Sequence, residues 1–193
     1  VTKVSSKSNI ENYLIKNLFK LHLREILFLG CKKVFYLFAD KIFRVFNIFF
    51  SVKSVLRKFN ISFFEIHYDI NKDQYIEKIS LYKPDIIISS CSLIFGSKVL
   101  KIPKYGCLNR HTSLLPSYAG IYPVFHSISD GDKWSGVTIH LMTEKIDDGE
   151  ILAQEKILNY QNNLSKIYKN AFSISSKLTI DAIDNLLTSK KFI

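Results

Sequence analysis

The sequence is poor in the residues that mark several protein classes. Among 193 residues there are only four prolines and seven glycines, which excludes collagen-like and low-complexity chains. The three cysteines, Cys31, Cys91 and Cys107, show no CxxC or metal-ligand spacing. A sparse, odd set of this kind predicts reduced thiols in a cytoplasmic protein. No internal repeat of solenoid length is visible.

Long uncharged stretches are scarce as well. The longest mostly apolar one, His111–Ser129, holds two prolines, two histidines and four serines, so no membrane span is predicted. The opening VTKVSSKSNIEN is too polar for a signal peptide. The chain starts at Val1 and its one methionine is Met142, which suggests a fragment without its native N-terminus.

Apolar residues make up 47% of the chain and charged residues 23%, a balance that predicts one folded domain with a real core. The 27 Lys and Arg residues outnumber 17 Asp and Glu, giving a net charge of +10. This excess favours an anionic partner such as a phosphate, a nucleic acid or a membrane surface. A solvated surface rich in lysine explains it equally well.

Residues 12–50 carry apolar side chains at steps of three and four, with basic residues between them. This pattern predicts two amphipathic helices broken near Gly30. Glu25–Gly30 (EILFLG) has an alternative interpretation as a strand. The basic, aromatic residues of 12–50 could form a helix that binds a membrane surface. Two helices that face the protein core are the favoured interpretation. We expect residues 1–50 to form a basic helical segment and residues 51–193 a catalytic domain.

From residue 52 onward, helix and strand patterns alternate, which predicts a three-layer α/β domain with a mostly parallel sheet. Asn71 is expected to cap one of its helices, and the apolar run Asp85–Ser90 is typical of a strand buried on both faces. Strands are expected at Ile61–Tyr68, Asp85–Ser90, Gly106–His111, Gly136–Thr143 and Glu150–Lys156, with helices over 52–59, 72–82, 97–101, part of 118–130, and 164–187.

Polar side chains follow these predicted strands. Asn109 and His111 are separated by one residue, so both point to the same face of a strand, and Asp147 lies in a loop closed by Gly149. An amide donor, an imidazole that gains or loses a proton near neutral pH and a carboxylate that orients it could meet in one crevice and transfer protons. Taken alone, Asn-x-His is a weak pattern, and an ordinary loop histidine explains it more often.

Longer segments carry more information. The run NRHTSLLP over 109–116, Tyr118-Ala-Gly120, GVTIH over 136–140, Ile146-Asp-Asp-Gly149 and Gln154 keep their order and spacing. Together they resemble the formyltransferase family, which transfers a formyl group from 10-formyltetrahydrofolate to an amine. The resemblance covers roughly residues 84–157.

The resemblance implies a Rossmann-like fold, catalytic roles for Asn109, His111 and Asp147, and 10-formyltetrahydrofolate as co-substrate without a metal. It places the folate against the backbone of two loops. It also adds two supporting side chains, one in the loop after His111 and one on the strand expected at Gly136–Thr143. The implied folate-binding residues are Leu93, Ile94, Phe95, Thr143, Ile146 and Asp148, and the implied supporting residues are Ser113 and His140.

The acceptor amine stays open at this point. The initiator methionyl-tRNA is placed first, a nucleotide-linked amino sugar second and phosphoribosylglycinamide third. A formyltetrahydrofolate hydrolase and an inactive folate-binding domain are the alternatives outside transfer. Arg110 departs from the family pattern, which has an apolar residue there. Arg110 either has partners inside the fold or contacts an anionic acceptor, and the first is favoured.

Overall fold

The computed structural model describes residues 51–159 and 164–188, together with residues 27, 31, 34–36, 38–39, 42 and 48–49. The chain forms two compact units, Val1–Tyr68 and Asp69–Ile193, and the expected division at residue 50 stays a prediction. The helices expected over 12–50 and the alternative strand at 25–30 lie outside the described residues, apart from single helical positions such as Leu27 and Ala39. No described helix is both long and apolar enough to cross a membrane.

The first unit contains helix α3, Val52–Lys58, which confirms the helix expected over 52–59. The side chain of Ser51 accepts a hydrogen bond from the backbone N–H of Ser54 and so caps the helix. The strand expected at Ile61–Tyr68 is wrong, because these residues are neither strand nor helix and pair with none of the strands in the described part of the chain. β-Branched and aromatic residues stabilise a strand only where a neighbouring strand is present.

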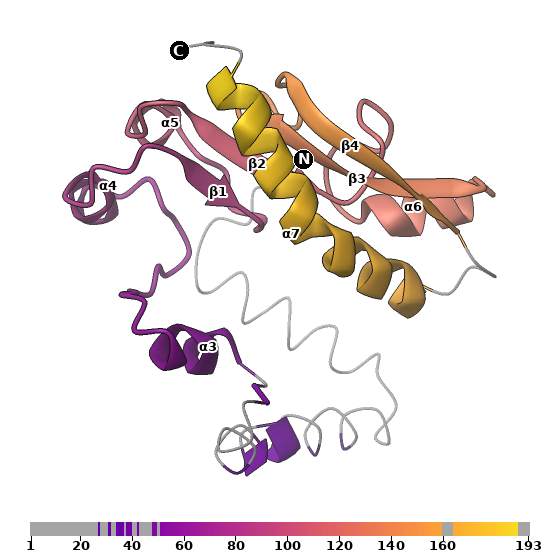
Figure 1. The fold of residues 1–193 in the computed structure, drawn as a ribbon, viewed down its shortest axis with the longest axis horizontal. Helices are drawn as coiled ribbons and strands as arrows, with labels where there is room; N and C mark the ends of the chain where they lie inside the picture. Colours follow the sequence, from indigo (N-terminus) through magenta and orange to yellow (C-terminus); the bar gives the residue numbers. More distant parts are fainter. Residues whose placement is uncertain are drawn as a thin grey trace. The chain divides into compact units, whose positions relative to one another are not determined.

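The second unit holds the remaining elements, which agree with the expected order (Figure 1). Each is shorter than or within a few residues of its expected bounds. The elements are α4 Asp73–Ser80, β1 Ile87–Ser89, α5 Ser97–Leu100, β2 Cys107–His111, α6 Pro123–Ser129, β3 Trp134–Leu141, β4 Ile151–Leu158 and α7 Leu164–Thr188.

The four strands form one sheet in the order β1-β2-β3-β4. Strands β1 and β2 are parallel, whereas β2 with β3 and β3 with β4 are antiparallel. The α/β fold is confirmed, but the expectation of a mostly parallel sheet is wrong for the described strands. The connection from β3 to β4, residues 142–150, is shorter than the dozen or so residues that a parallel crossover needs.

Strand β1 is not buried on both faces, contrary to what its apolar sequence predicts. It lies at the edge of the described sheet, and Ile88 is 53% exposed. The apolar run was expected to be buried on both faces, and in the described part of the chain only one side chain of β1, that of Ser89, is buried.

One face of the sheet is apolar and packs against α7, which crosses it in Figure 1. Leu108, Val137, Ile139, Leu141 and Ile157 lie on this face. They alternate with the polar residues of the same strands, as the two-residue period of a strand requires. Helix α7 buries one stripe at steps of three and four against them, formed by Ile167, Ala171, Ser175, Leu178, Ala182 and Leu186.

The other face of the sheet is polar. The strand register places Ser89 beside Asn109, Asn109 beside His140, His111 beside Thr138, and Thr138 beside Gln154. Side chains of paired residues point to the same face, so these six polar residues form one continuous surface. The apolar face therefore holds the domain together, and the polar face is available for chemistry.

We predict that two adjacent leucines of α7 differ sharply in their contribution to stability. Leu186 is 1% exposed and Leu187 is 47% exposed. Leu186→Ala should lower the free energy of unfolding by about 2–5 kcal/mol, because it leaves a cavity in the core. Leu187→Ala, the matched control, should cost less than about 1 kcal/mol. Denaturant unfolding measures both, and equal losses would contradict the packing of α7 described above.

Candidate active site

Three polar side chains that the sequence singled out meet on the polar face of the sheet. The amide nitrogen of Asn109 donates a hydrogen bond to Oδ1 of Asp147 at 3.2 Å. The Nδ1 atom of His111 lies 3.4 Å from the other carboxylate oxygen, Oδ2. The Asp147 side chain is 11% exposed and that of His111 is 8% exposed, so the three groups interact with little water between them.

The loop after β3 brings Asp147 to this position. Since β3 runs antiparallel to β2, its last residue, Leu141, pairs with Leu108 near the start of β2. The chain then turns back over the polar face and closes where the N–H of Leu141 donates to the carbonyl of Glu150 at 2.9 Å. Asp147 therefore reaches Asn109 through this returning loop, and not because parallel strands end at one edge of the sheet.

Two residues of this loop have backbone requirements that explain the sequence DDG. Asp147 has a φ of 50°, in the left-handed region that aspartate tolerates better than most residues. Gly149 passes so close to Leu141 that a Cβ atom would lie 1.7 Å from the carbonyl oxygen of Leu141. Only glycine fits there without moving the backbone.

His111 is held between two acceptors. Its Nε2 atom lies 2.9 Å from the carbonyl oxygen of Tyr118, and its Nδ1 atom faces the carboxylate of Asp147. Only a ring protonated on both nitrogens donates to both acceptors.

His140 is the second imidazole in contact with the carboxylate of Asp147. Its Nδ1 atom lies 2.9 Å from the carbonyl oxygen of Leu141 and so carries a proton. Its Nε2 atom lies 3.3 Å from the amide nitrogen of Asn109 and 3.4 Å from Oδ1 of Asp147. In the neutral ring Nε2 accepts from Asn109, and in the protonated ring it donates to Asp147.

The spacing of the GVTIH segment follows from contacts that Gly136, Thr138 and His140 make on the same face of β3. A Cβ atom on Gly136 would lie 2.4 Å from the Cδ2 atom of Leu114, so glycine leaves room for the loop after β2. The hydroxyl of Thr138 donates to the carbonyl of Ser113 at 2.6 Å and accepts from the N–H of Leu115 at 3.2 Å. Gly136 and Thr138, at alternate positions of β3, thus hold the loop that follows β2 in place.

Two further side chains fix the same loop. Ser113 is 1% exposed, and its hydroxyl donates to the carbonyl of Ser117 at 2.7 Å. The amide of Gln154, on β4, donates to Thr138 Oγ1 at 2.8 Å and to the carbonyl of Leu115 at 3.0 Å. These bonds shape the turn that carries Tyr118 and Gly120 to the cluster.

Comparison with known proteins identifies the fold family. Residues 57–183 match the formyl transferase family. This chain belongs to the formyl transferase family. The resemblance noted in the sequence is therefore confirmed.

Among curated relatives, a methionyl-tRNA formyltransferase of Ehrlichia canis is 40% identical over 61% of this chain and 39% of its own length. One of Thermotoga maritima is 34% identical over 71% of this chain and 44% of its own length. The chain thus spans about two fifths of the length of these relatives.

Solved structures support the same family. A phosphoribosylglycinamide formyltransferase from Bacillus halodurans has a TM-score of 0.53 and 25% identity, with 61% of each chain covered. A sugar N-formyltransferase from Shewanella has a TM-score of 0.53 and 27% identity, covering 65% of this chain and 50% of the other.

The residues that the family resemblance implies for folate binding lie on two loops. Leu93, Ile94 and Phe95 follow β1, whose Ser89 pairs with Asn109. Thr143, Ile146 and Asp148 lie on the same loop as Asp147 and are exposed. Ile94 and Ile146 are 62% and 51% exposed, whereas Phe95 is buried.

Sequence reasoning missed the backbone groups of the site. The N–H of Gly120 donates to Oδ2 of Asp147 at 2.8 Å, and the carbonyl of Tyr118 accepts from His111. Nearly every residue type has the same backbone N–H and carbonyl, so the residue type does not reveal which of these groups reach a site. The left-handed φ of Tyr118 and the positive φ of Gly120 aim them inward, and the Tyr-x-Gly spacing was the one available signal.

Arg110 lies on the opposite face, toward α7, and has partners inside the fold. Its Nε atom donates to Ser90 Oγ at 2.9 Å, its Nη1 atom donates to Ser175 Oγ at 3.3 Å, and its guanidinium lies 4.4 Å from the ring centre of Phe172. Burial lowers the pKa of Arg110. These contacts favour the structural interpretation of this departure from the family pattern.

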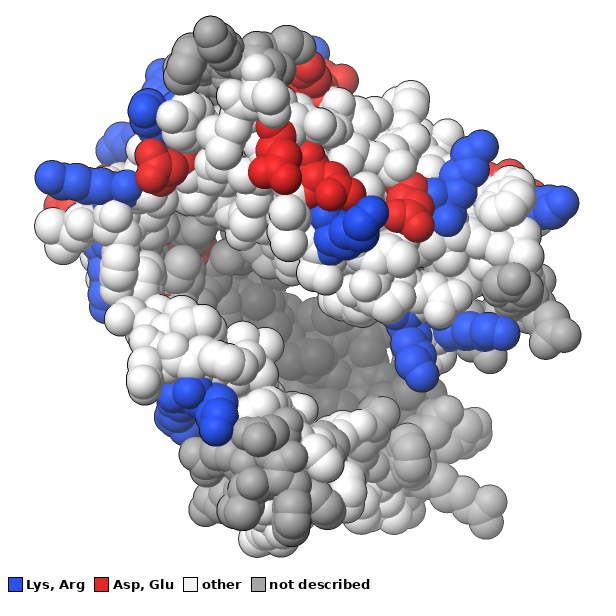
Figure 2. Space-filling view, viewed as in Figure 1, with Lys and Arg blue, Asp and Glu red and all other residues white. Residues whose placement is uncertain are grey.

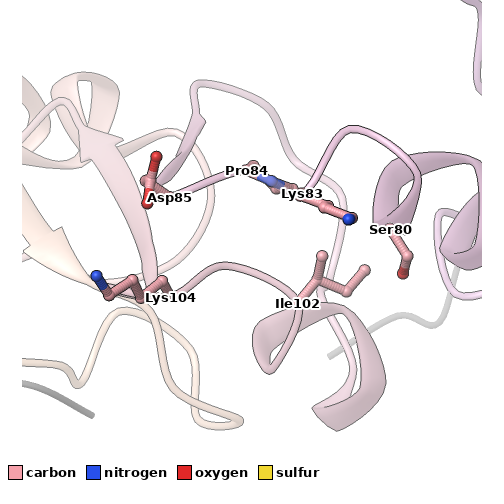
Figure 3. A pocket seen from close by; sticks show the side chains of 6 residues that line it. All are labelled: Ser80, Lys83, Pro84, Asp85, Ile102 and Lys104. Atoms are coloured by element: carbon pink, nitrogen blue, oxygen red, sulfur yellow. The ribbon is translucent and has the colours of Figure 1, made fainter.

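A pocket of about 350 Å³ lies elsewhere, at the amino end of β1 (Figure 3). It is lined by Ser80, Lys83, Pro84, Asp85, Ile102 and Lys104. None of the cluster residues lines it. In α/β sheets ligands bind outside the carboxyl ends of the strands, so this hollow is separate from the candidate active site.

The charge of Asp147 depends on its neighbours. Burial alone would raise the pKa of its carboxyl, but the hydrogen bond from His140, the backbone N–H of Gly120 and the charges of His111 and His140 lower it below the ordinary value. Asp147 is therefore a carboxylate at neutral pH, and the folded state gains stability from that charge.

We predict that Asp147→Asn removes one acid-sensitive contribution to stability. A carboxyl whose pKa is lower in the folded state stabilises the protein above its unfolded pKa, about 3.9, and loses that effect as pH falls. The wild type should therefore lose free energy of unfolding relative to Asp147→Asn as pH decreases below about 4. Urea unfolding at several pH values measures this difference, and a constant difference would contradict the lowered pKa.

Proposed function

We propose that this chain transfers a formyl group from 10-formyltetrahydrofolate to a primary amine. The observation that carries the proposal is the convergence of Asn109, His111 and Asp147, with contacts of 3.2 Å and 3.4 Å to a single carboxylate. Membership of the formyl transferase family supports the same reaction. The exposed loops beside the cluster provide a place for the folate.

In the proposed reaction the uncharged amine of the acceptor attacks the formyl carbon. A new C–N bond forms, and the formyl oxygen becomes negatively charged in a tetrahedral intermediate. The bond from that carbon to the folate nitrogen then breaks, and the proton lost by the acceptor amine passes to the folate nitrogen. Atoms and electrons balance without an oxidant or a reductant.

The side chains stabilise the charge that develops. Asn109 offers an amide N–H, and His111 offers the positive charge that its two acceptors hold in place. Asp147 keeps His111 charged and relays the amine proton through water. The donor and the acceptor must also be held in reacting geometry, which is a large part of the rate gain.

We predict that Asn109→Ala, His111→Ala and Asp147→Ala each reduce formyl transfer strongly without unfolding the domain. Losing one donor to a developing oxyanion costs about 10²–10³ in rate. The controls are Asn185→Ala and Asp181→Ala, which change the same residue types on the exposed side of α7. Transfer is followed with a labelled formyl donor, and circular dichroism checks folding. Near-full activity of any cluster variant would refute its assignment.

Among acceptors, we place the α-amine of an aminoacyl-tRNA of the methionyl initiator type first. The relatives named methionyl-tRNA formyltransferase support this choice, and a net charge of +10 suits a polyanionic partner. On the face drawn in Figure 2, basic and acidic side chains are interspersed, so charge alone does not select RNA. A nucleotide-linked amino sugar is second, because solved sugar N-formyltransferases share the fold.

Free thiols support a cytoplasmic location for this reaction. Cys31, Cys91 and Cys107 are all unpaired, as expected in a reducing compartment.

A panel of amines identifies the acceptor. The chain is supplied with 10-formyltetrahydrofolate and, in turn, methionyl initiator tRNA, an amino sugar nucleotide and phosphoribosylglycinamide. We expect formylated tRNA, with binding that weakens as salt rises. Formate release in the absence of any amine would replace this proposal with a hydrolase. Folate binding without either product would replace it with a binding domain.

A further inference from the structure

Asn71 makes contacts that a helix cap does not explain. Its position in the sequence predicts a cap on the following helix, but α4 begins at Asp73, and the residue at its cap position, Lys72, makes no side-chain capping bond. The side chain of Asn71 is instead directed to the loop after β1, more than twenty residues further along the chain.

The amide of Asn71 binds the backbone of that loop at two points. Its Nδ2 atom donates to the carbonyl of Ile94 at 2.9 Å, and its Oδ1 atom accepts from the N–H of Gly96 at 2.6 Å. The two bonds span one residue, Phe95, whose side chain is buried. A side-chain amide that bonds a carbonyl and an N–H of the same segment fixes both its position and its orientation.

Asp69 fixes which way the Asn71 amide points. Its Oδ1 atom accepts from Nδ2 of Asn71 at 2.9 Å and from the backbone N–H of Asn71 at 2.9 Å. Rotating the amide by half a turn would place its oxygen against Asp69 and the carbonyl of Ile94, and both are acceptors. All three hydrogen-bonding groups of the amide are therefore used in one orientation.

The clamped segment belongs to the loop that leaves β1 at the strand pair of the cluster. Ser89, at the end of β1, pairs with Asn109, and the chain reaches Ile94, which is 62% exposed, five residues later. The buried side chain of Phe95 anchors this segment, and Asn71 holds its backbone. The exposed Ile94 and the neighbouring backbone are thus held in a fixed position on the loop that follows β1.

We propose that Asn71 is a positioning residue for the folate substrate, and that it acts by holding the backbone of residues 94–96 in the conformation that binds this ligand. This rests on the proposed function, because it takes 10-formyltetrahydrofolate as the ligand. Asn71 contacts the loop and not the reacting atoms, so it affects how tightly the folate binds rather than the chemical step.

Two variants of the full chain test the clamp from opposite sides. Asn71→Ala removes both bonds to the loop. Gly96→Ala leaves Asn71 intact but adds a Cβ atom 2.8 Å from its Oδ1 atom, at a φ of −79° that alanine adopts without strain. Asn185→Ala is the matched control, since its exposed amide also donates to a distant backbone carbonyl, that of Leu152.

We predict that both variants raise the KM for 10-formyltetrahydrofolate and the Kd for tetrahydrofolate about tenfold, the effect of losing one or two hydrogen bonds to the loop. The kcat at saturating folate and the KM for the amine should stay within about twofold of the control. Thermal unfolding of each variant verifies that the domain is folded.

The outcomes separate this proposal from the function on which it rests. If the wild type binds tetrahydrofolate and the variants bind it as tightly as Asn185→Ala does, the role of Asn71 is overturned and the proposed function stands. A fall in kcat with unchanged KM also overturns it. If the wild type does not bind tetrahydrofolate, the proposed function fails, and the role of Asn71 fails with it.

Discussion

The structure of the site depends on one carboxylate that is largely removed from water. Asp147 is 11% exposed on its side chain, and a buried carboxylate is costly unless charged or hydrogen-bonding partners surround it. It has four such partners in the Gly120 N–H, the Asn109 amide and two imidazole rings. These partners come from three segments, so this one charge ties β2, β3 and the loop at residues 118–120 together.

The two-residue period of a strand explains how one chain meets these requirements. Alternate positions of β2 and β3 place Leu108, Val137 and Ile139 against α7 and leave Asn109 and His140 on the opposite face. The apolar face supplies the burial that keeps the domain folded. The polar face can then hold groups that would destabilise a core, because every one of the cluster side chains has a partner among the described residues.

The parts of the site that follow from strand parity were predictable from the sequence. Asn109 and His111 were placed on one face because a strand alternates, and the structure has them there. The antiparallel direction of β3 was not predictable, since GVTIHLMT suits either direction. The expected strand at Ile61–Tyr68 shows the same limit, because strand propensity does not supply a partner. Asn71 was misassigned because its position before a helix predicts a cap, whereas its partners lie more than twenty residues away.

The internal bonds of the cluster bear on how it would favour a transition state. Before substrate arrives, the amide of Asn109 donates to Asp147, and both nitrogens of His111 face acceptors. A neutral formyl oxygen that takes over one of these bonds gains little, because one hydrogen bond replaces another. A negatively charged oxygen gains more, since bonds to charged groups contribute about 1 kcal/mol beyond neutral ones. In the proposed reaction a site already satisfied by its own bonds therefore binds the ground state weakly and the charged intermediate well, which is the difference that accelerates a reaction.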